Sequence, residues 1–164
     1  MNLYVLKGET NINNDLKGEI NMIKNCFNIL DTFEIKKFPC EIDNGLLLIF
    51  THGVYRGKYD NEDYIININE QLLNTIPKNY CLKFNSNDEF NDTLWLDTKY
   101  LSKLINIKNS IIIFDACYSS DLNINTLSGW KSNLIFTCGY VKEYSSIIGS
   151  DLAKAINKFY EQNI

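Results

Sequence analysis

Two short runs of large apolar residues predict the strands at the centre of this chain. Residues 111–114 are Ile-Ile-Ile-Phe, and residues 46–50 are Leu-Leu-Leu-Ile-Phe. Continuous apolar runs of this length are typical of strands buried on both faces of a parallel sheet. Segments 3–6 and 134–138 predict two further strands, and the looser alternation over 33–38 predicts an edge strand. We therefore expect a mostly parallel central sheet of about five strands.

Other segments show helical or hairpin patterns. In the first, apolar residues recur every three or four positions, which predicts an amphipathic helix with a cap among residues 13–15. Its apolar positions are Leu16, Ile20, Ile23, Phe27 and Leu30. Residues 97–105 predict a second helix capped by Asp97, residues 151–160 predict a third, and residues 54–68 predict a β-hairpin. The chain is expected to be an α/β fold in one domain, residues 1–164.

Composition narrows the class of the protein. The 164 residues suit one domain with its own core, and a net charge of -4 offers no electrostatic case for binding nucleic acid or an anionic membrane. No signal peptide or membrane span is expected. The five cysteines form no CxxC pair, so neither a disulfide framework nor a zinc site is indicated, and a reducing cytoplasm is the simplest compartment. The acidic residues at 85–92 are interpreted as a solvated turn rather than a calcium site.

The candidate chemistry follows the two central strands. Cys117 lies just after the 111–114 strand, and His52, the only histidine, lies just after the 46–50 strand. Neighbouring parallel strands would bring both residues to the carboxyl edge of the sheet, where open α/β sheets bind ligands. An imidazole beside a thiol can deprotonate it and later protonate a leaving amine. Backbone N–H groups of Gly53 and Cys117 could then form an oxyanion hole.

The alternative interpretation is purely structural. Free cysteine is among the most buried residue types, so Cys117 could be an inert core thiol. His52 could be a half-buried side chain at the end of a strand. Isolated motifs transfer poorly between proteins, and only the matched strand contexts of the two residues favour the functional interpretation.

The sequences around these residues resemble the active-site motifs of the caspase-like cysteine peptidases. Leu48 to Gly53 resembles the apolar strand that ends in His-Gly, and Ile112 to Ser119 resembles the strand that ends in Asp-Ala-Cys. The metacaspase and clostripain forms are the nearer ones. Weaker similarity extends to segments 17–21, 96–104 and 149–156. The resemblance implies a three-layer α-β-α fold and a cysteine endopeptidase without a metal or other cofactor, acting on a protein or peptide substrate.

The resemblance also assigns roles. Cys117 would be the nucleophile and His52 the general base and acid, with Gly53 and Cys117 donating the oxyanion N–H groups. Asp115 would line a pocket for a substrate Lys or Arg, although a strand-end aspartate that bonds loop amides is an equal alternative. Another wall of that pocket would come from Cys138, Gly139 and Tyr140.

Some positions depart from the family pattern. Ser120 replaces a usual glycine, and Met22 stands where the first helix often carries a pocket aspartate. The sixth strand common in this fold is not evident, so a second copy or an activating partner could supply an edge. A catalytically weak or inactive module acting as a regulatory subunit is therefore the alternative function. A Cys enzyme acting on a non-peptide substrate is a third possibility.

The loop after the nucleophile, residues 118–132, is mostly small and polar. Such residues bury little surface to offset the entropy of ordering, so the loop is expected to order only when a substrate or activator binds. The alternative is a packed loop. Its anchors would be Leu122, Ile124, Leu127 and Trp130.

Overall fold

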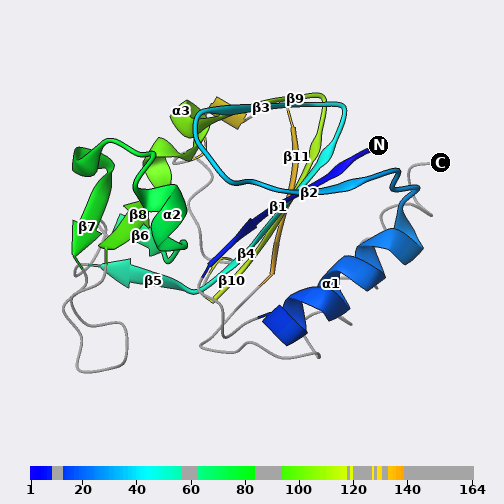
Figure 1. Ribbon diagram of the computed structural model, residues 1–164, viewed down its shortest axis with the longest axis horizontal. Helices are drawn as coiled ribbons and strands as arrows, with labels where there is room; N and C mark the ends of the chain where they lie inside the picture. Colours follow the sequence, from blue (N-terminus) through cyan, green and yellow to red (C-terminus); the bar gives the residue numbers. More distant parts are fainter. Residues whose placement is uncertain are drawn as a thin grey trace.

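A five-stranded parallel sheet forms the centre of the computed structural model (Figure 1). Its strands are β1 (Leu3–Lys7), β2 (Thr32–Glu34), β4 (Leu46–Thr51), β10 (Ile111–Ala116) and β11 (Leu134–Cys138). They lie in the order β11-β10-β4-β1-β2, and each neighbouring pair runs parallel. The predicted five-stranded sheet is confirmed, although its edge strand is Thr32–Glu34 and does not extend over 33–38. All six residues of β4 are buried, as expected for a central strand with an uninterrupted apolar run.

The structure describes part of the chain. The described residues are 1–8, 13–56, 63–83, 94–117, 119, 127, 129–130 and 133–138. The helix expected over 151–160, the acidic segment 85–92, Ser120, Gly139 and Tyr140 lie outside them.

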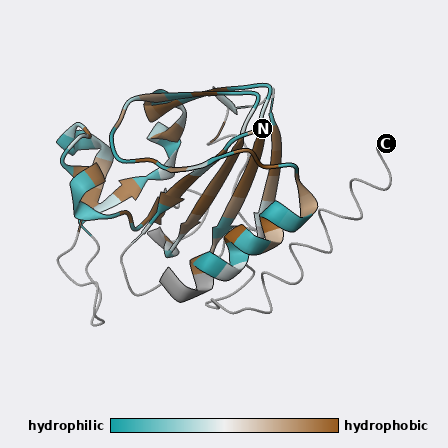
Figure 2. Ribbon diagram, turned by 45° about the vertical axis from the view of Figure 1, so that its right-hand side comes forward, coloured by the Kyte–Doolittle hydropathy of each residue, from teal (hydrophilic) through white to brown (hydrophobic). Residues whose placement is uncertain are grey.

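One face of the sheet is covered by α1 (Asn13–Cys26), which lies along the mostly hydrophobic central strands in Figure 2. Leu16, Ile23 and Phe27 pack with sheet residues in one buried cluster. Burial of each such side chain contributes about 1.5–3 kcal/mol, so this apolar stripe holds the helix in place. The helix was expected to reach Leu30, and this was wrong. Leu30 is 72% exposed, because the chain has already turned towards β2 and the Leu30 N–H bonds the carbonyl of Met1.

A second, antiparallel sheet packs on the other side, at the left of Figure 1. Its strands are β5 (Gly53–Arg56), β6 (Asp63–Ile66), β7 (Cys81–Lys83) and β8 (Leu94–Asp97), in the order β5-β6-β8-β7. The pairing of β5 with β6 confirms the predicted hairpin. Strands β7 and β8 were not predicted.

Short elements complete this side of the core. They are the parallel pair β3 (Cys40–Asp43) and β9 (Ile105–Lys108), the single-turn helices α2 (Glu70–Leu73) and α3 (Leu101–Leu104), and the 3-10 turns η3 (Lys78–Tyr80) and η4 (Thr98–Tyr100). The predicted cap is confirmed, since a carboxylate oxygen of Asp97 accepts a hydrogen bond from the Lys99 N–H at 3.1 Å. Ile105 was predicted to belong to this helix, and this was wrong: it begins β9, because its backbone pairs with Cys40. Within the described ranges, no long helix covers this face.

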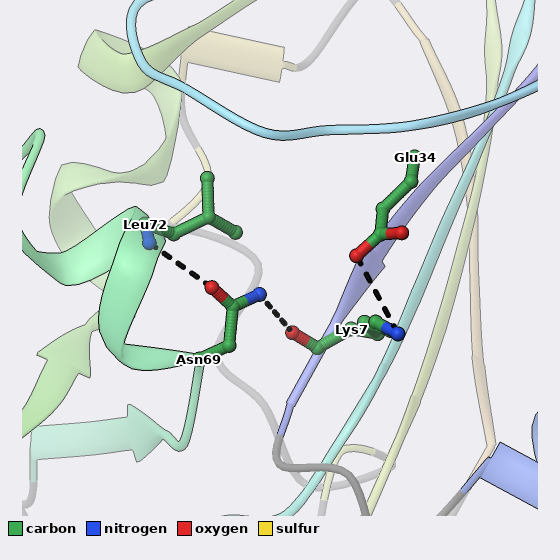
Figure 3. Close-up of polar contacts among 4 residues, drawn as sticks. All are labelled: Lys7, Glu34, Asn69 and Leu72. Atoms are coloured by element: carbon green, nitrogen blue, oxygen red, sulfur yellow. Dashed lines mark hydrogen bonds and ion pairs between the residues drawn. The ribbon is translucent and has the colours of Figure 1, made fainter.

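Asn69 joins helix α2 to the carboxyl end of β1 (Figure 3). Its side-chain oxygen accepts a hydrogen bond from the Leu72 N–H at 3.0 Å and caps α2. Its side-chain amide donates to the Lys7 carbonyl at 3.4 Å. The side-chain Nζ of Lys7 in turn lies 3.5 Å from a carboxylate oxygen of Glu34 on the neighbouring strand β2. The Asn69 side chain therefore connects α2 to the central sheet.

The register between β4 and β10 is fixed at their amino ends. The Ser110 hydroxyl accepts a hydrogen bond from the Gly45 N–H at 3.1 Å and donates to the Lys108 carbonyl at 2.7 Å. The Ile111 N–H donates to the Gly45 carbonyl at 3.0 Å. With these bonds Ile111 lies opposite Leu46, so the carboxyl ends of the two strands are level with each other.

Candidate active site

The ends of β4 and β10 bring the two predicted catalytic residues to neighbouring positions. Thr51 and Ala116 form the last pair between these strands, and His52 and Cys117 are the next residue on each chain. Neighbouring strands lie about 4.8 Å apart, so the backbones of His52 and Cys117 are close together. Cys117 is 5% exposed, and Nε2 of the half-buried His52 is itself buried. The predicted adjacency of the two strands is confirmed.

The second sheet starts at this edge and holds the segment after β4. Gly53 opens β5 and pairs with Ile66, and the Asn67 N–H donates to the His52 carbonyl at 2.9 Å. The Thr51 hydroxyl also donates to the Asn67 carbonyl. The backbone of His52 is therefore bounded by the parallel sheet on one side and the antiparallel sheet on the other.

Gly53 lies directly against Cys117. A Cβ atom added at Gly53 would lie 2.9 Å from the Cys117 carbonyl oxygen and 2.7 Å from Cζ of Tyr64. Side chains do not tolerate contacts this short, so only glycine fits without displacement of its neighbours. The close approach places the main chains of both predicted oxyanion donors at one point of the fold.

Tyr64 and Ser119 fix the turn that follows β10. The Tyr64 hydroxyl donates to the Cys117 carbonyl at 2.7 Å, and the Ser119 hydroxyl donates to the Phe114 carbonyl at 3.1 Å. Sequence analysis assigned Tyr64 no role. The only signal was its place in the alternating hairpin pattern, which does not identify its partner 53 residues away.

Asp115 lies inside β10 rather than at its end, because the strand continues through Ala116. It is 2% exposed and lies in register with Phe50 on one side and Cys138 on the other. Successive strand residues point to opposite faces, so Asp115 shares the face of Ile113, which packs in the α1 cluster. Cys138 ends β11 beside Asp115, whereas the other two predicted wall residues lie outside the described ranges.

Glu19 is a second buried carboxylate on this side of the sheet. It is 3% exposed and belongs to α1, between the core residues Leu16 and Ile23. A carboxyl group is costly to bury in apolar surroundings, so a glutamate on the packed face of a helix is an unusual placement. Sequence analysis missed it. Its spacing of three and four residues from Leu16 and Ile23 was the available signal.

Three other described cysteines are poor nucleophiles near neutral pH. Burial raises the pKa of Cys26 and Cys81 above the ordinary value of 9.0, and raises the pKa of Cys40 to about 11. The thiolate is the reactive form, so these side chains remain almost fully protonated thiols at neutral pH. They should react slowly with electrophiles.

The described part of the chain gives no metal or membrane site. Its His, Cys, Asp and Glu residues include no group of three or more that could hold a metal ion. None of its helices is both long enough and apolar enough to cross a bilayer. Segment 85–92, which was interpreted as a solvated turn rather than a calcium site, falls outside the described residues.

Two described residues bear on the loop after Cys117. Leu127 and Trp130 are fully buried, and the Trp130 indole N–H donates to the Ile105 carbonyl at 2.9 Å. At these two positions the packed alternative is confirmed. Most of segment 118–132 lies outside the described residues, so its ordering on ligand binding stays a prediction.

Comparison with known proteins adds no relative: no family model, no curated protein and no solved structure matches this chain. The resemblance to caspase-like peptidases therefore rests on the sequence motifs, and the functional argument rests on the geometry of the strand ends.

Proposed function

We propose that this chain is a cysteine endopeptidase of the caspase-like type, with a His52–Cys117 dyad and a preference for Lys or Arg before the scissile bond. The observation that carries the proposal is the register of β4 and β10, which puts these two residues next to each other at the carboxyl edge of a parallel sheet. The proposal includes the three-layer arrangement of that family. A reducing compartment such as the cytoplasm would keep the nucleophile as a thiol.

The proposed reaction is acyl transfer to Cys117. The His52 imidazole takes the thiol proton, and the sulfur attacks the carbonyl carbon of the substrate peptide bond. Backbone N–H groups of Gly53 and Cys117 stabilise the oxyanion. As the C–N bond breaks, the imidazolium gives its proton to the leaving amine, and a thioester remains on Cys117. His52 then deprotonates a water molecule that attacks the thioester, releases the carboxylic acid and restores the thiol.

Asp115 supports the preference for a basic residue. A carboxylate with 2% exposure beside the proposed nucleophile can hold an ammonium or guanidinium group by a charge-assisted hydrogen bond. A pocket for acidic residues would instead favour a bidentate guanidinium, and Arg56 is the only arginine in the chain.

The test is labelling and turnover with matched variants. Lys- and Arg-containing acyloxymethyl ketone peptides should label wild-type protein once, at Cys117, as read by peptide mass spectrometry. Cys117→Ala and His52→Ala should each lose several orders of magnitude in peptide turnover while retaining the folded circular dichroism spectrum. Cys81→Ala, which removes a thiol of raised pKa, is the control and should retain activity. Full turnover by Cys117→Ala, or a label on another cysteine, would overturn the peptidase proposal.

The burial of Cys117 favours a second candidate, a regulatory module without turnover. A nucleophile that is 5% exposed must become more accessible before a peptide can reach it. If folded wild-type protein resists the peptide probe even at high concentration, and cleaves no member of a peptide library, the regulatory function is the better one. A partner would then be sought by cross-linking.

A further inference from the structure

Tyr64 makes a buried contact that the proposed chemistry does not yet use. Its side chain is 2% exposed, and its hydroxyl donates to the Cys117 carbonyl at 2.7 Å. The bond connects the middle of β6 to the residue directly after β10. It therefore links the antiparallel sheet to the proposed nucleophile itself.

Tyr64 is held firmly from other directions. Its carbonyl accepts a hydrogen bond from the Thr98 hydroxyl at 2.7 Å. Its ring packs on Phe114 of β10, with ring centroids 6.0 Å apart and planes tilted by 52°. Its own strand pairs with β5 on one side and β8 on the other. A side chain fixed in this way by packing and hydrogen bonding can hold another group in place.

The same end of the ring also limits the position of Gly53. The Cβ position of Gly53 lies 2.7 Å from Tyr64 Cζ and 2.9 Å from the Cys117 carbonyl oxygen. The hydroxyl end of Tyr64 thus contacts the backbone of Gly53, which follows His52, and also the backbone of Cys117. These two backbone segments carry the dyad and both proposed oxyanion donors.

We propose that Tyr64 is a positioning residue for the active site. Its hydroxyl orients the peptide group that follows Cys117, and the hydroxyl end of its ring also sets the separation between Gly53 and Cys117. The hydroxyl acts on a carbonyl oxygen, so Tyr64 contributes geometry rather than proton transfer. The inference rests on the proposed peptidase function, because positioning matters most for a reaction whose geometry must be held closely.

Two electrophiles separate positioning from packing. A peptide acyloxymethyl ketone forms an oxyanion when sulfur attacks its carbonyl, so its reaction depends on the Gly53 and Cys117 N–H groups. Iodoacetamide reacts by direct displacement of iodide at carbon and needs only an accessible thiolate. The ratio of the two rates at Cys117 therefore reports the geometry of the oxyanion site, and changes in thiol exposure or ionisation cancel from it to first order.

Tyr64→Phe is the decisive variant because it keeps the ring and removes only the hydroxyl. We expect the ratio of ketone to iodoacetamide rates to fall by about tenfold or more, with a similar loss in kcat and little change in KM. Tyr100→Phe is the matched control, because the Tyr100 ring stacks on Tyr80 with centroids 4.1 Å apart, and its ratio should equal that of wild type. Thr98→Val, which removes the bond to the Tyr64 carbonyl, should lower the ratio in the same direction but less.

The outcomes are distinguishable. An unchanged ratio and kcat in folded Tyr64→Phe, with active wild type, overturns the positioning role and leaves the peptidase proposal intact. Equal losses in both rates, together with lower stability, identify Tyr64 as a packing residue only and also overturn it. Wild-type protein that reacts with iodoacetamide at Cys117 but never with peptide ketones or peptides overturns both proposals. If Tyr64→Phe does not fold, the ratio measured in Thr98→Val decides in the same way.

Discussion

Replacing Gly53 with alanine is the sharpest test of the close approach between the two sheets. The added methyl group would lie closest to the Tyr64 hydroxyl oxygen, and it would also lie 2.7 Å from Tyr64 Cζ and 2.9 Å from the Cys117 carbonyl oxygen. Normal contacts between such atoms are about 3.5 Å or longer, so each distance must increase by more than half an ångström. Neither Tyr64 nor Cys117 can move away easily, because both residues are buried and hydrogen-bonded to each other.

The cost follows from overpacking. Forcing an extra methyl group into a filled core typically costs about 1–3 kcal/mol, and we expect Gly53→Ala to fall in the upper part of that range. The strain should also separate Gly53 from Cys117, because the carbonyl oxygen is one of the atoms that must move. Peptide turnover should therefore fall together with stability.

Urea unfolding followed by circular dichroism measures the effect on the free energy of unfolding. Gly18→Ala is the matched control: Gly18 lies in α1, and a Cβ added there meets nothing within 4 Å. That control should stabilise the protein by about 0.5–1 kcal/mol, since alanine is the better helix former. The two replacements should change the free energy of unfolding in opposite directions. The loss in Gly53→Ala therefore cannot be a general effect of adding a methyl group.

A double-mutant cycle locates the strain. Tyr64→Leu shortens the side chain that faces Gly53, so Gly53→Ala should cost at least about 1 kcal/mol less in that background than in wild type. Purely additive costs would contradict the steric argument, as would a Gly53→Ala variant with the stability of wild type.

Three further perturbations test other parts of the structure. Ser110→Ala removes the acceptor for the Gly45 N–H and should lower the free energy of urea unfolding by about 1–3 kcal/mol. Because the pKa of Cys40 is raised to about 11, its alkylation should remain slow until strongly alkaline pH. Stability should fall from pH 9.0 towards about 11, since the unfolded state ionises that thiol first, and Cys40→Ser should reduce this loss in pH-dependent melting. Asp115→Asn should lower kcat/KM for Lys peptides about 10- to 100-fold while iodoacetamide still labels Cys117.

The central part of the fold could be predicted because its physical signal is local. A run such as residues 46–50 can be satisfied only by burial on both faces, and residues 111–114 carry the same signal. Two such strands have few places in one sheet other than its middle. Their adjacency, and with it the neighbouring positions of His52 and Cys117, follows from these two patterns.

The short strands could not be predicted because their partners are remote. Ile105 continues the helical spacing of Leu101 and Leu104, yet its backbone pairs with Cys40 of β3. A three- or four-residue strand has little propensity of its own, so tertiary pairing decides its conformation. Leu30 shows the same limit, since a continuing apolar spacing does not indicate where the chain leaves the helix.

Tyr64 and Glu19 were missed for different reasons. The role of Tyr64 depends on a hydrogen bond to a residue 53 positions away, which no local pattern encodes. Glu19 did have a local signal, because a carboxylate three residues after Leu16 and four before Ile23 must lie on the buried side of the helix. A charged residue within the apolar stripe of a helix therefore predicts a buried polar side chain.

The two sheets contribute different residues to the proposed site, and their arrangement limits the side from which a peptide can reach Cys117. The parallel sheet places His52 and Cys117 on neighbouring strands, whereas the antiparallel sheet supplies Tyr64, which fixes the Cys117 carbonyl and packs against Gly53. The Tyr64 side chain, which binds the Cys117 carbonyl, also covers that side of the proposed nucleophile. A change that loosens this contact to expose the thiol must therefore disturb the backbone that the reaction needs. Access for a peptide has to come from another side of Cys117, with the bond from Tyr64 kept intact.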